Sequence, residues 1–431
     1  MSNKQISVSI FCMAYNQENY IRETIEGFLM QKTNFEYEIL IHEDASTDST
    51  ADILKYYESM YPDKIKVVYE EKNIYGTGVD YFYDILAPLA KGKYIALCEG
   101  DDAWIDEDKL QLQFDYMESH PDCSLVGHRC YLQYPPNWDR IRDNRSMGYR
   151  ESGIVPYETI FEKWEIPTNS FFFRKETFME MPKFFREAPT GDEPLEFYLA
   201  NKGYIYFINR VMSVYNKMTA DSWSVKFINS GFEKMARYYA GYIQLFESID
   251  EYTGYTKHDF YDACIKERIR RAVIYIFFNT KSISDVRKML NQLADVVPKR
   301  WKDYVLEQEK CFWFYNEEKA NRIWQRANDK KIYVYGAGAL ATKFLFDVAP
   351  ENMKVSGFII SDKKKNNGEL EGIKISNLSE IEDTCRDEFI VVAVIDQWAE
   401  EIKKELQERG IKNVFWVYET VFNPLVADCI E

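Results

Sequence analysis

Two hydrophobic periods alternate along the first hundred residues. Short apolar runs rich in β-branched and aromatic residues predict strands at Ile6–Cys12, Tyr37–His42, Ile65–Tyr69 and Tyr94–Cys98. Apolar residues at helical spacing separate these runs, over Glu18–Gln31, from Ile53 to Tyr57 and around Tyr81–Leu89. Strands that alternate with helices predict a doubly wound α/β sheet, and ligands bind such sheets beyond the carboxyl ends of the strands.

The hydrophobic pattern changes twice further along the chain. Leu125–Leu132 and Ser170–Arg174 predict additional strands, whereas helical spacing dominates from about Phe227 to Ala327. Strand and helix patterns alternate again over Lys330–Val417. We therefore expect an α/β domain over residues 1–226, a helical linker or insert domain over 227–327 and a small α/β domain over 328–431.

Composition restricts the function and the location. The 431 residues are 46% apolar and carry a net charge of −16, which argues against nucleic acid as the main partner. No run approaches the roughly 20 apolar residues of a spanning helix, and the first residues lack a signal-peptide pattern. Cys12 and Cys98 lie in apolar runs and are expected to be buried, reduced thiols. We expect a cytoplasmic protein; peripheral contact with the inner membrane, for example through Lys266, Arg268, Arg270 and Arg271, stays open.

The strand at Tyr94–Cys98 ends abruptly in acidic residues. Glu99, Asp101 and Asp102 lie within four positions, and carboxylates so close together repel one another unless a cation joins them. Carboxylate oxygens suit Mg²⁺ or Mn²⁺, and these ions usually also bind substrate phosphates. The alternative is an acidic loop that caps the helix from about Asp106.

Two other loops follow equivalent strand ends. After the first strand, Tyr15 can stack on a base and Asn16 can hydrogen-bond in the same pocket. After the second, Asp44 can accept a hydrogen bond from a base or a ribose hydroxyl. Taken singly, Tyr15 is equally an ordinary packing residue and Asp44 a turn or cap residue. Three such loops at one sheet edge favour a nucleotide site.

The same stretches resemble a known family. SVSIFCMAYNQENYI, EILIHEDASTDSTADIL and KGKYIALCEGDDAWIDEDKLQLQ are similar, in sequence and spacing, to the family 2 glycosyltransferases of GT-A fold. The resemblance implies a nucleotide-sugar donor, usually a UDP-sugar, and a divalent metal (Mn²⁺ or Mg²⁺) at an Asp-x-Asp-like element, here Glu99-Gly100-Asp101 followed by Asp102. Nucleotide-sugar binding is then expected at Ala14, Tyr15, Asn16, Asp44 and Asp101, metal binding at Asp101 and Asp102, with Glu43 and Glu99 as secondary candidates.

A further acidic residue lies on the acceptor side of the resemblance. Asp192 stands near the predicted start of an apolar-periodic helix, where a helix cap is the simplest explanation for an isolated Asp. The segment GDEPLEFYLANKGYIYFINRVMSVY resembles the acceptor-side element of the family. The resemblance places the general base at Asp192, with Glu193 as a second candidate.

The chain departs from the family pattern just beyond this segment. The family usually continues Tyr-Arg-x-His, but Asn216 and Met218 stand at the Arg and His positions. Methionine is a poor ligand for a hard cation, so Lys217 becomes a candidate for the missing positive charge. Three alternatives stay open: an altered metal shell, which we favour, a mechanism less dependent on metal, and a degenerate enzyme.

The last domain carries a glycine-rich turn. Gly336 and Gly338 lie between a strand and a helix, and Asp362 follows the next strand, which is the arrangement of a dinucleotide fingerprint. The domain resembles the small Rossmann-like domains appended to sugar-modifying enzymes. A structural or docking role, including oligomerisation through the C-terminal half, is favoured over nucleotide binding.

These features together predict an inverting, metal-dependent glycosyltransferase. The expected reaction moves a sugar from a nucleotide-sugar to a hydroxyl of a glycan or lipid-linked acceptor, in polysaccharide biosynthesis. One alternative is a non-catalytic sugar-nucleotide-binding scaffold. A nucleotidyltransferase ranks lower, because CMAYNQEN after the first strand is neither glycine-rich nor basic. The sequence leaves the sugar, the linkage and the oligomeric state open.

Overall fold

The computed structural model groups the chain into two compact units, residues 1–231 with 245–264 and residues 232–244 with 265–431. The described residues are 5–133, 146–162, 166–217, 227, 230–280, 282–308, 327, 330–338, 341–342, 345, 354–364, 368–394 and 399–416. Each unit is taken by itself below. The three-part division expected from the sequence stays a prediction.

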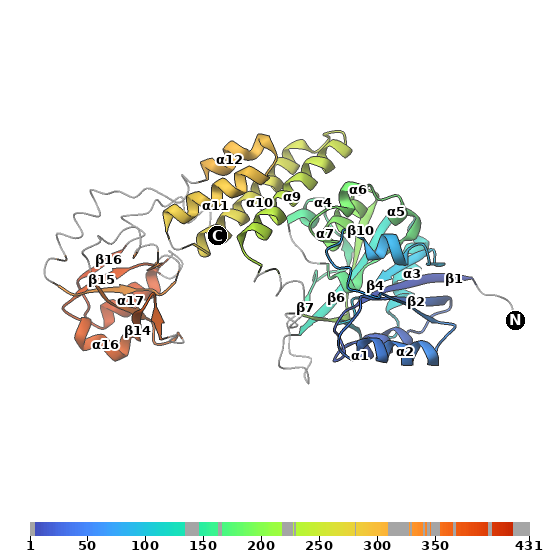
Figure 1. Cartoon of the computed structure of the whole chain (residues 1–431), viewed down its shortest axis with the longest axis horizontal. Helices are drawn as coiled ribbons and strands as arrows, with labels where there is room; N and C mark the ends of the chain where they lie inside the picture. The colour runs from blue at the N-terminus through green and yellow to red at the C-terminus, as the bar shows by residue number, and fades with distance from the viewer. Residues whose placement is uncertain are drawn as a thin grey trace. The chain divides into compact units, whose positions relative to one another are not determined.

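The first unit is built on a mixed sheet with the strand order β3-β2-β1-β4-β9-β6-β10-β5, with β7 and β8 paired to β6 and β10 (Figure 1). Its strands are β1 Ile6–Ala14, β2 Glu36–Glu43, β3 Ile65–Tyr69, β4 Tyr94–Leu97, β5 Ala103–Trp104, β6 Cys123–Gln133, β7 Ser146–Met147, β8 Gly153–Ile154, β9 Phe172–Arg174 and β10 Tyr204–Asn216. The first four strands are parallel, whereas β9 runs antiparallel to both β4 and β6. The α/β class expected from the sequence is confirmed.

Helices cover this sheet and supply its core. They are α1 Ile21–Leu29, α2 Thr50–Met60, the π-helix η1 Tyr81–Leu86, α3 Lys109–Ser119, α4 Tyr157–Glu162, the 3₁₀ turn η2 Thr168–Ser170, α5 Lys175–Met179, α6 Lys183–Arg186 and α7 Asp192–Ala200. Ile21, Ile25 and Phe28 form the buried face of α1, and they pack with fully buried β1 residues such as Val8 and Ile10. The apolar residues spaced at the 3.6-residue period in the sequence of α1 are therefore the ones that are buried against the sheet.

Parallel pairing brings the loops after β1, β2 and β4 to one edge of the sheet. The backbone N–H of Asp44 donates to the carbonyl of Ala14 (3.0 Å), and that of Gly100 donates to the carbonyl of Met13 (2.8 Å). The convergence expected from the sequence is thus confirmed, because all three strands end side by side.

A helical region follows the first sheet. Its elements are α9 Phe232–Tyr252, α10 His258–Phe278, α11 Ile283–Val296, the 3₁₀ turn η3 Lys299–Trp301 and α12 Lys302–Glu307. Ser282 and Asp285 form a capping box that begins α11. Among the described residues, no helix combines the length and the apolar character needed to cross a membrane.

The basic cluster noted in α10 is not an open cationic patch. Arg270 and Arg271 both pair with Glu267, at 2.7 and 2.8 Å. Arg268 is buried, with its guanidinium 4.2 Å from the centre of the Tyr242 ring. Glu267 therefore offsets part of the charge of Arg270 and Arg271, and the buried Arg268 is not available to a membrane surface.

The second sheet has the order β13-β14-β12-β11-β15-β16. Its strands are β11 Ile332–Tyr335, β12 Val355–Ile360, β13 Glu369–Leu370, β14 Ile373–Asn377, β15 Phe389–Val392 and β16 Val414–Trp416, accompanied by the helices α16 Leu378–Cys385 and α17 Ala399–Glu408. The sequence missed the β13–β14 hairpin, because β13 is only two residues long. Parallel pairing of β11 with β12 and β15 confirms the Rossmann-like character of this region.

Gly27 tests the close packing of α1 against the acidic loop. Alanine normally stabilises a helix by about 1 kcal/mol relative to glycine. A Cβ at Gly27, however, would come within 2.6 Å of the Trp104 carbonyl oxygen. We therefore expect Gly27→Ala to lower the free energy of unfolding by about 1–3 kcal/mol in urea denaturation. Gly153→Ala, where nothing lies within 4 Å, is the control, and equal effects of the two changes would contradict the tight packing.

Candidate active site

Asp102 anchors the acidic loop from inside the protein. Its side chain is 1% exposed, Oδ1 accepts the backbone N–H of Asn216 (2.9 Å) and Oδ2 accepts the side-chain amide of Asn169 (2.8 Å). Its backbone carbonyl accepts the Thr24 hydroxyl (2.6 Å). Three separate parts of the chain therefore hold this one residue in place.

Glu99 and Asp101 lie on the more open side of the same loop. Both are partly exposed. Burial, together with the nearby carboxylates of Asp101 and Asp192, raises the pKa of Glu99 to about 8. The acidic loop after β4 and the start of α7 thus form one electrostatic cluster, which gains stability from a proton or a cation.

Asp192 is the first residue of α7, and Gly191 occupies the N-cap position without a side-chain cap bond. Gly191, and not Asp192, therefore holds the N-cap position. Its Oδ1 accepts the backbone N–H of Glu193 (2.9 Å), and its Oδ2 accepts the Thr168 hydroxyl (3.2 Å). Burial, followed by the nearby Glu193 carboxylate, raises the pKa of Asp192 above its usual value, which suits a general base.

Tyr215 is a site residue that the sequence did not single out. Burial raises the pKa of its phenol, as do four carboxylates, those of Glu99, Asp102, Asp192 and Asp101. A tyrosine hydroxyl among acids stays protonated, so it remains a hydrogen-bond donor for an anionic ligand. Two sequence signals could have found it: its place at the end of β10, a strand whose register is set by β6, and its match to the tyrosine of the Tyr-Arg-x-His pattern.

Two loops on the nucleotide side are bonded to each other. Asn16 has a left-handed backbone (φ 51°), its N–H donates to the Ser46 hydroxyl (3.0 Å) and its Oδ1 accepts the Thr47 N–H (2.8 Å). Glu43 accepts the N–H of Ser46 (2.7 Å). Asn16 and Glu43 therefore shape the loops around Ala14 and Tyr15, and their contact with a nucleotide stays a prediction.

Asp44 is 3% exposed and organises the next segment of the chain. Its Oδ1 accepts the backbone N–H of Ile74 (2.7 Å), and its carbonyl accepts the Asn73 side-chain amide (3.2 Å). Tyr75, with 53% of its surface exposed, follows directly. Nothing in the sequence indicated that residues 73–75 lie beside Asp44. Because Tyr75 is exposed next to Asp44, it is an additional candidate to contact a nucleotide base.

Lys217 follows Tyr215 and Asn216 at the same strand end. Its ammonium lies 5.8 Å from the centre of the Tyr215 ring, and the side-chain amide of Asn216 donates to the Asp101 carbonyl (2.5 Å). Lys217 is therefore positioned to contribute positive charge beside the cluster. Met218 lies outside the described residues, so the three alternatives for the metal shell stay open.

The carboxylates provide the donor chemistry of a hard cation. No group of three or more His, Cys, Asp or Glu residues that could hold a metal occurs in the part of the chain that is described. A cation held by one or two carboxylates and by substrate phosphates needs no such preformed cage. Asp101 is the more accessible candidate ligand, because both oxygens of Asp102 already accept hydrogen bonds inside the protein.

In the second sheet, Asp362 is engaged by its own domain. Its Oδ1 accepts the N–H and the hydroxyl of Ser379 (2.9 and 2.7 Å), and its Oδ2 pairs with Arg409 (2.7 Å). Gly336 has φ 111°, and a Cβ there would lie 2.7 Å from the Ala393 carbonyl. These contacts favour structural roles for both residues. Nucleotide binding by Gly336, Gly338 and Asp362 stays a prediction.

The fold and the acidic edge agree with a match to a known family. Residues 9–178 match the family model for glycosyl transferase family 2. Over these residues the chain is therefore similar to the family 2 glycosyltransferases, and its sheet has the GT-A fold. Residues 328–414 match a second model, C2185-like, N-terminal.

Relatives match the first half of the chain. An uncharacterised Mycobacterium tuberculosis protein is 31% identical over 220 residues, covering 50% of this chain and 60% of its own length. The putative teichuronic acid biosynthesis glycosyltransferase TuaG of Bacillus subtilis is 36% identical, covering 31% of this chain and 51% of the relative. The Escherichia coli UDP-Glc:alpha-D-GlcNAc-diphosphoundecaprenol beta-1,3-glucosyltransferase WfaP is 36% identical, covering 26% and 41%. The chain thus spans less than two thirds of these relatives.

A solved structure shares the fold. Staphylococcus aureus TarS 1-349, crystallised in complex with UDP-GlcNAc, aligns with a TM-score of 0.51 at 16% identity, covering 71% of this chain and 86% of that one. At this identity the likeness supports the GT-A fold and nothing finer.

The hydrogen bond between Asn169 and Asp102 predicts that loss of the Asn169 side-chain amide strongly lowers the stability of the protein. Asn169 is fully buried, donates to Asp102 Oδ2 and to the Val214 carbonyl, and accepts the Ser213 hydroxyl. We expect Asn169→Ala to lower the free energy of unfolding by about 2–3 kcal/mol in urea, because a buried carboxyl loses its donor. Ser213→Ala removes only the neutral hydrogen bond and should cost about 1 kcal/mol. A cost of Asn169→Ala no greater than that of Ser213→Ala would show that the anchor is unimportant.

Proposed function

We propose that this protein is an inverting glycosyltransferase that moves a sugar from a UDP-sugar to a hydroxyl of a glycan or lipid-linked acceptor in polysaccharide biosynthesis. One observation carries the proposal: neighbouring residues of η2 hold the base candidate and the acidic loop, since the Thr168 hydroxyl donates to Asp192 Oδ2 (3.2 Å) and the Asn169 amide donates to Asp102 Oδ2 (2.8 Å). A base, and beside it carboxylates that could hold a cation against the departing diphosphate, are the two parts that displacement of a nucleoside diphosphate requires.

The donor side uses the loops after β1 and β2. Tyr15 and Tyr75 offer aromatic faces for a base, and Asp44 is held by Ile74 in the same region. The printed name of WfaP includes UDP-Glc as donor and a diphosphoundecaprenol-linked acceptor. That name supports a UDP-sugar and a lipid-linked acceptor for this chain, and the name of TuaG supports a polysaccharide product.

The reaction side combines Asp192 with the acidic loop. Asp192 accepts the proton of the acceptor hydroxyl while the acceptor oxygen bonds to the anomeric carbon and the bond from that carbon to the diphosphate breaks. A divalent cation bound at Asp101 would supply positive charge for the departing diphosphate. The Tyr215 hydroxyl and the Lys217 ammonium add a donor and a charge beside it. Thr168 orients the Asp192 carboxylate through its hydroxyl.

We propose a cytoplasmic location on the evidence of the thiols. The six cysteines of the described residues are buried and form no disulfide, namely Cys12, Cys98, Cys123, Cys130, Cys264 and Cys385. Cysteines outside disulfides are typical of reducing compartments. Peripheral contact with a membrane that carries a lipid-linked acceptor is part of the same proposal.

Asp192 provides the first functional test. We expect Asp192→Asn to lower the kcat for sugar transfer by about 10²–10⁴-fold, because the amide cannot accept the acceptor proton. UDP release is measured with a panel of UDP-sugars and Mn²⁺, and UDP affinity is measured in parallel. Glu193→Gln is the matched control and should retain most activity. UDP binding without turnover of any donor by the unmodified protein would instead favour a non-catalytic scaffold.

Asp101 provides the metal test. We expect Asp101→Asn to weaken Mn²⁺-dependent UDP binding by about tenfold or more, since a metal-bridged contact of at least about 1.4 kcal/mol is lost. Binding is measured by calorimetry with and without chelator. The exposed Asp115→Asn on α3 is the control. Metal-dependent binding that survives Asp101→Asn unchanged would contradict the assignment.

A further inference from the structure

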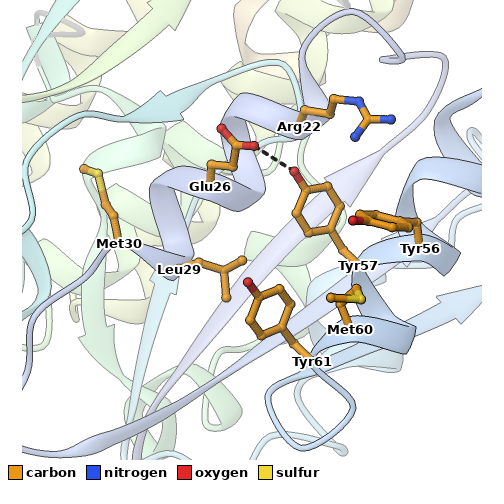
Figure 2. Close-up of a pocket in the computed structure, with 8 residues that line it drawn as sticks. All are labelled: Arg22, Glu26, Leu29, Met30, Tyr56, Tyr57, Met60 and Tyr61. Atoms are coloured by element: carbon orange, nitrogen blue, oxygen red, sulfur yellow. Dashed lines mark hydrogen bonds between the residues drawn. The ribbon is translucent and has the colours of Figure 1, made fainter.

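A pocket lies between α1 and α2 on the outer side of the first unit (Figure 2). Its volume is about 550 Å³, within the range of small-ligand sites. The residues that line it come from these two helices and their C-terminal caps: Arg22, Glu26, Leu29, Met30, Tyr56, Tyr57, Met60 and Tyr61. None of them belongs to the candidate active site.

Large apolar side chains are unusually open around this pocket. Tyr56 and Met60 are 54% and 58% exposed, and Tyr61 and Met30 are 42% and 36% exposed. A concentration of exposed aromatic and thioether side chains in a hollow is typical of a binding surface rather than of a solvated helix pair. Two of the three tyrosines thus present their rings to solvent.

Polar groups border the same rings. The Tyr57 hydroxyl donates to Glu26 Oε1 (2.9 Å), and Figure 2 shows this bond across the pocket. Burial and the Glu26 carboxylate raise the pKa of Tyr57, and the guanidinium of Arg22 offsets part of that rise. Tyr56 meets Tyr57 edge to face, with 5.5 Å between the ring centres. The pocket therefore combines fixed aromatic faces with adjacent donors and acceptors.

This combination matches the surface of a sugar ring. A pyranose has apolar C–H faces that pack on aromatic rings and a rim of hydroxyls that bond to Arg, Glu and Tyr side chains. A purely apolar partner would remove water from the exposed side chains of Arg22 and Glu26 and offer them no new hydrogen bonds. The lining thus favours a carbohydrate over an apolar ligand.

The charges of the two helices exclude an anionic ligand. Along Ile21–Leu29 and Thr50–Met60, the basic residues are Arg22 and Lys55, and the acidic residues are Glu23, Glu26, Asp52 and Glu58. Two basic against four acidic side chains give these helices a net negative charge, which repels phosphate polymers and anionic lipid surfaces. The expected ligand is an uncharged oligosaccharide.

The pocket is separate from the reacting centre. At the N-terminal ends of α1 and α2, the N–H of Glu18 donates to Asp48 (3.1 Å) and the N–H of Ser49 donates to Glu18 (2.9 Å), which joins the two loops. The pocket extends instead to Met30 and Tyr61 at the C-terminal ends of these helices. A ligand held there is neither the donor nor the hydroxyl that reacts.

We propose that the α1–α2 pocket binds an uncharged segment of the acceptor glycan, distant from the hydroxyl that receives the sugar. The biological role rests on the proposed function, because only a glycosyltransferase has such an acceptor. Binding of the oligosaccharide itself does not depend on catalysis. A second binding site for the same glycan, in addition to the one at the reacting hydroxyl, raises the effective concentration of a long acceptor near the active site.

Direct binding tests the pocket. Cellohexaose, maltohexaose and chitohexaose are titrated into the full chain at millimolar concentration and followed by saturation-transfer NMR. We expect at least one to bind, and Tyr56→Ala with Tyr61→Ala to weaken that binding by about tenfold. Tyr255→Ala, which removes a comparably exposed tyrosine outside the pocket, should leave the affinity unchanged.

The outcomes separate this proposal from the proposed function. Asp192→Asn should bind the oligosaccharide normally, so loss of transfer and loss of binding are distinguishable. Absence of binding by all three oligosaccharides, or binding that survives the double change, overturns the proposal. Two further results also overturn it: Tyr56-dependent binding to phosphatidylcholine–phosphatidylglycerol vesicles, which makes the pocket a membrane contact, and Tyr56-dependent dimerisation in sedimentation, which makes it a self-association surface.

Discussion

A single buried carboxyl group ties the active edge of this protein together. Asp102 is removed from water, and its two oxygens accept hydrogen bonds from Asn169 in η2 and from the end of β10 at Asn216. Leaving such a group unpaired is expensive, so the chain segments that supply the donors cannot move independently. This constraint fixes the acidic loop relative to the strand that carries Tyr215 and to the turn that carries Thr168.

The anchor explains how like charges are kept close together. Burial and repulsion by Asp101 and Asp192 together raise the pKa of Glu99, so its ionised form is destabilised. A loop held only by its own residues would relax and separate these groups. Because the hydrogen bonds of the buried Asp102 fix the loop, the carboxylates stay close together and continue to repel one another. The site therefore favours a ligand that brings positive charge, such as a metal–diphosphate complex.

The second sheet is stabilised by its own internal contacts. One oxygen of Asp362 accepts the backbone N–H of Ser379 at the start of α16. The other oxygen forms an ion pair with Arg409. The same carboxylate completes the spacing of a dinucleotide fingerprint in the sequence. Spacing alone therefore overstated the case for a nucleotide there, since a motif reports position along the chain and not whether the oxygens are already bonded.

The sequence by itself determined the fold class and the strand ends at which the loops converge, and it singled out Asp101, Asp102 and Asp192 as candidate site residues. Hydrophobic period and local motif encode these features, because each depends on neighbours along the chain. The sequence did not show that Asp102 is buried and bonded inside the protein whereas Asp101 is partly exposed. It also did not show that Asn169 and Tyr215 lie beside these carboxylates. These arrangements depend on contacts between residues 67 or more positions apart, such as Asn169 with Asp102, and only the tertiary structure brings such residues together.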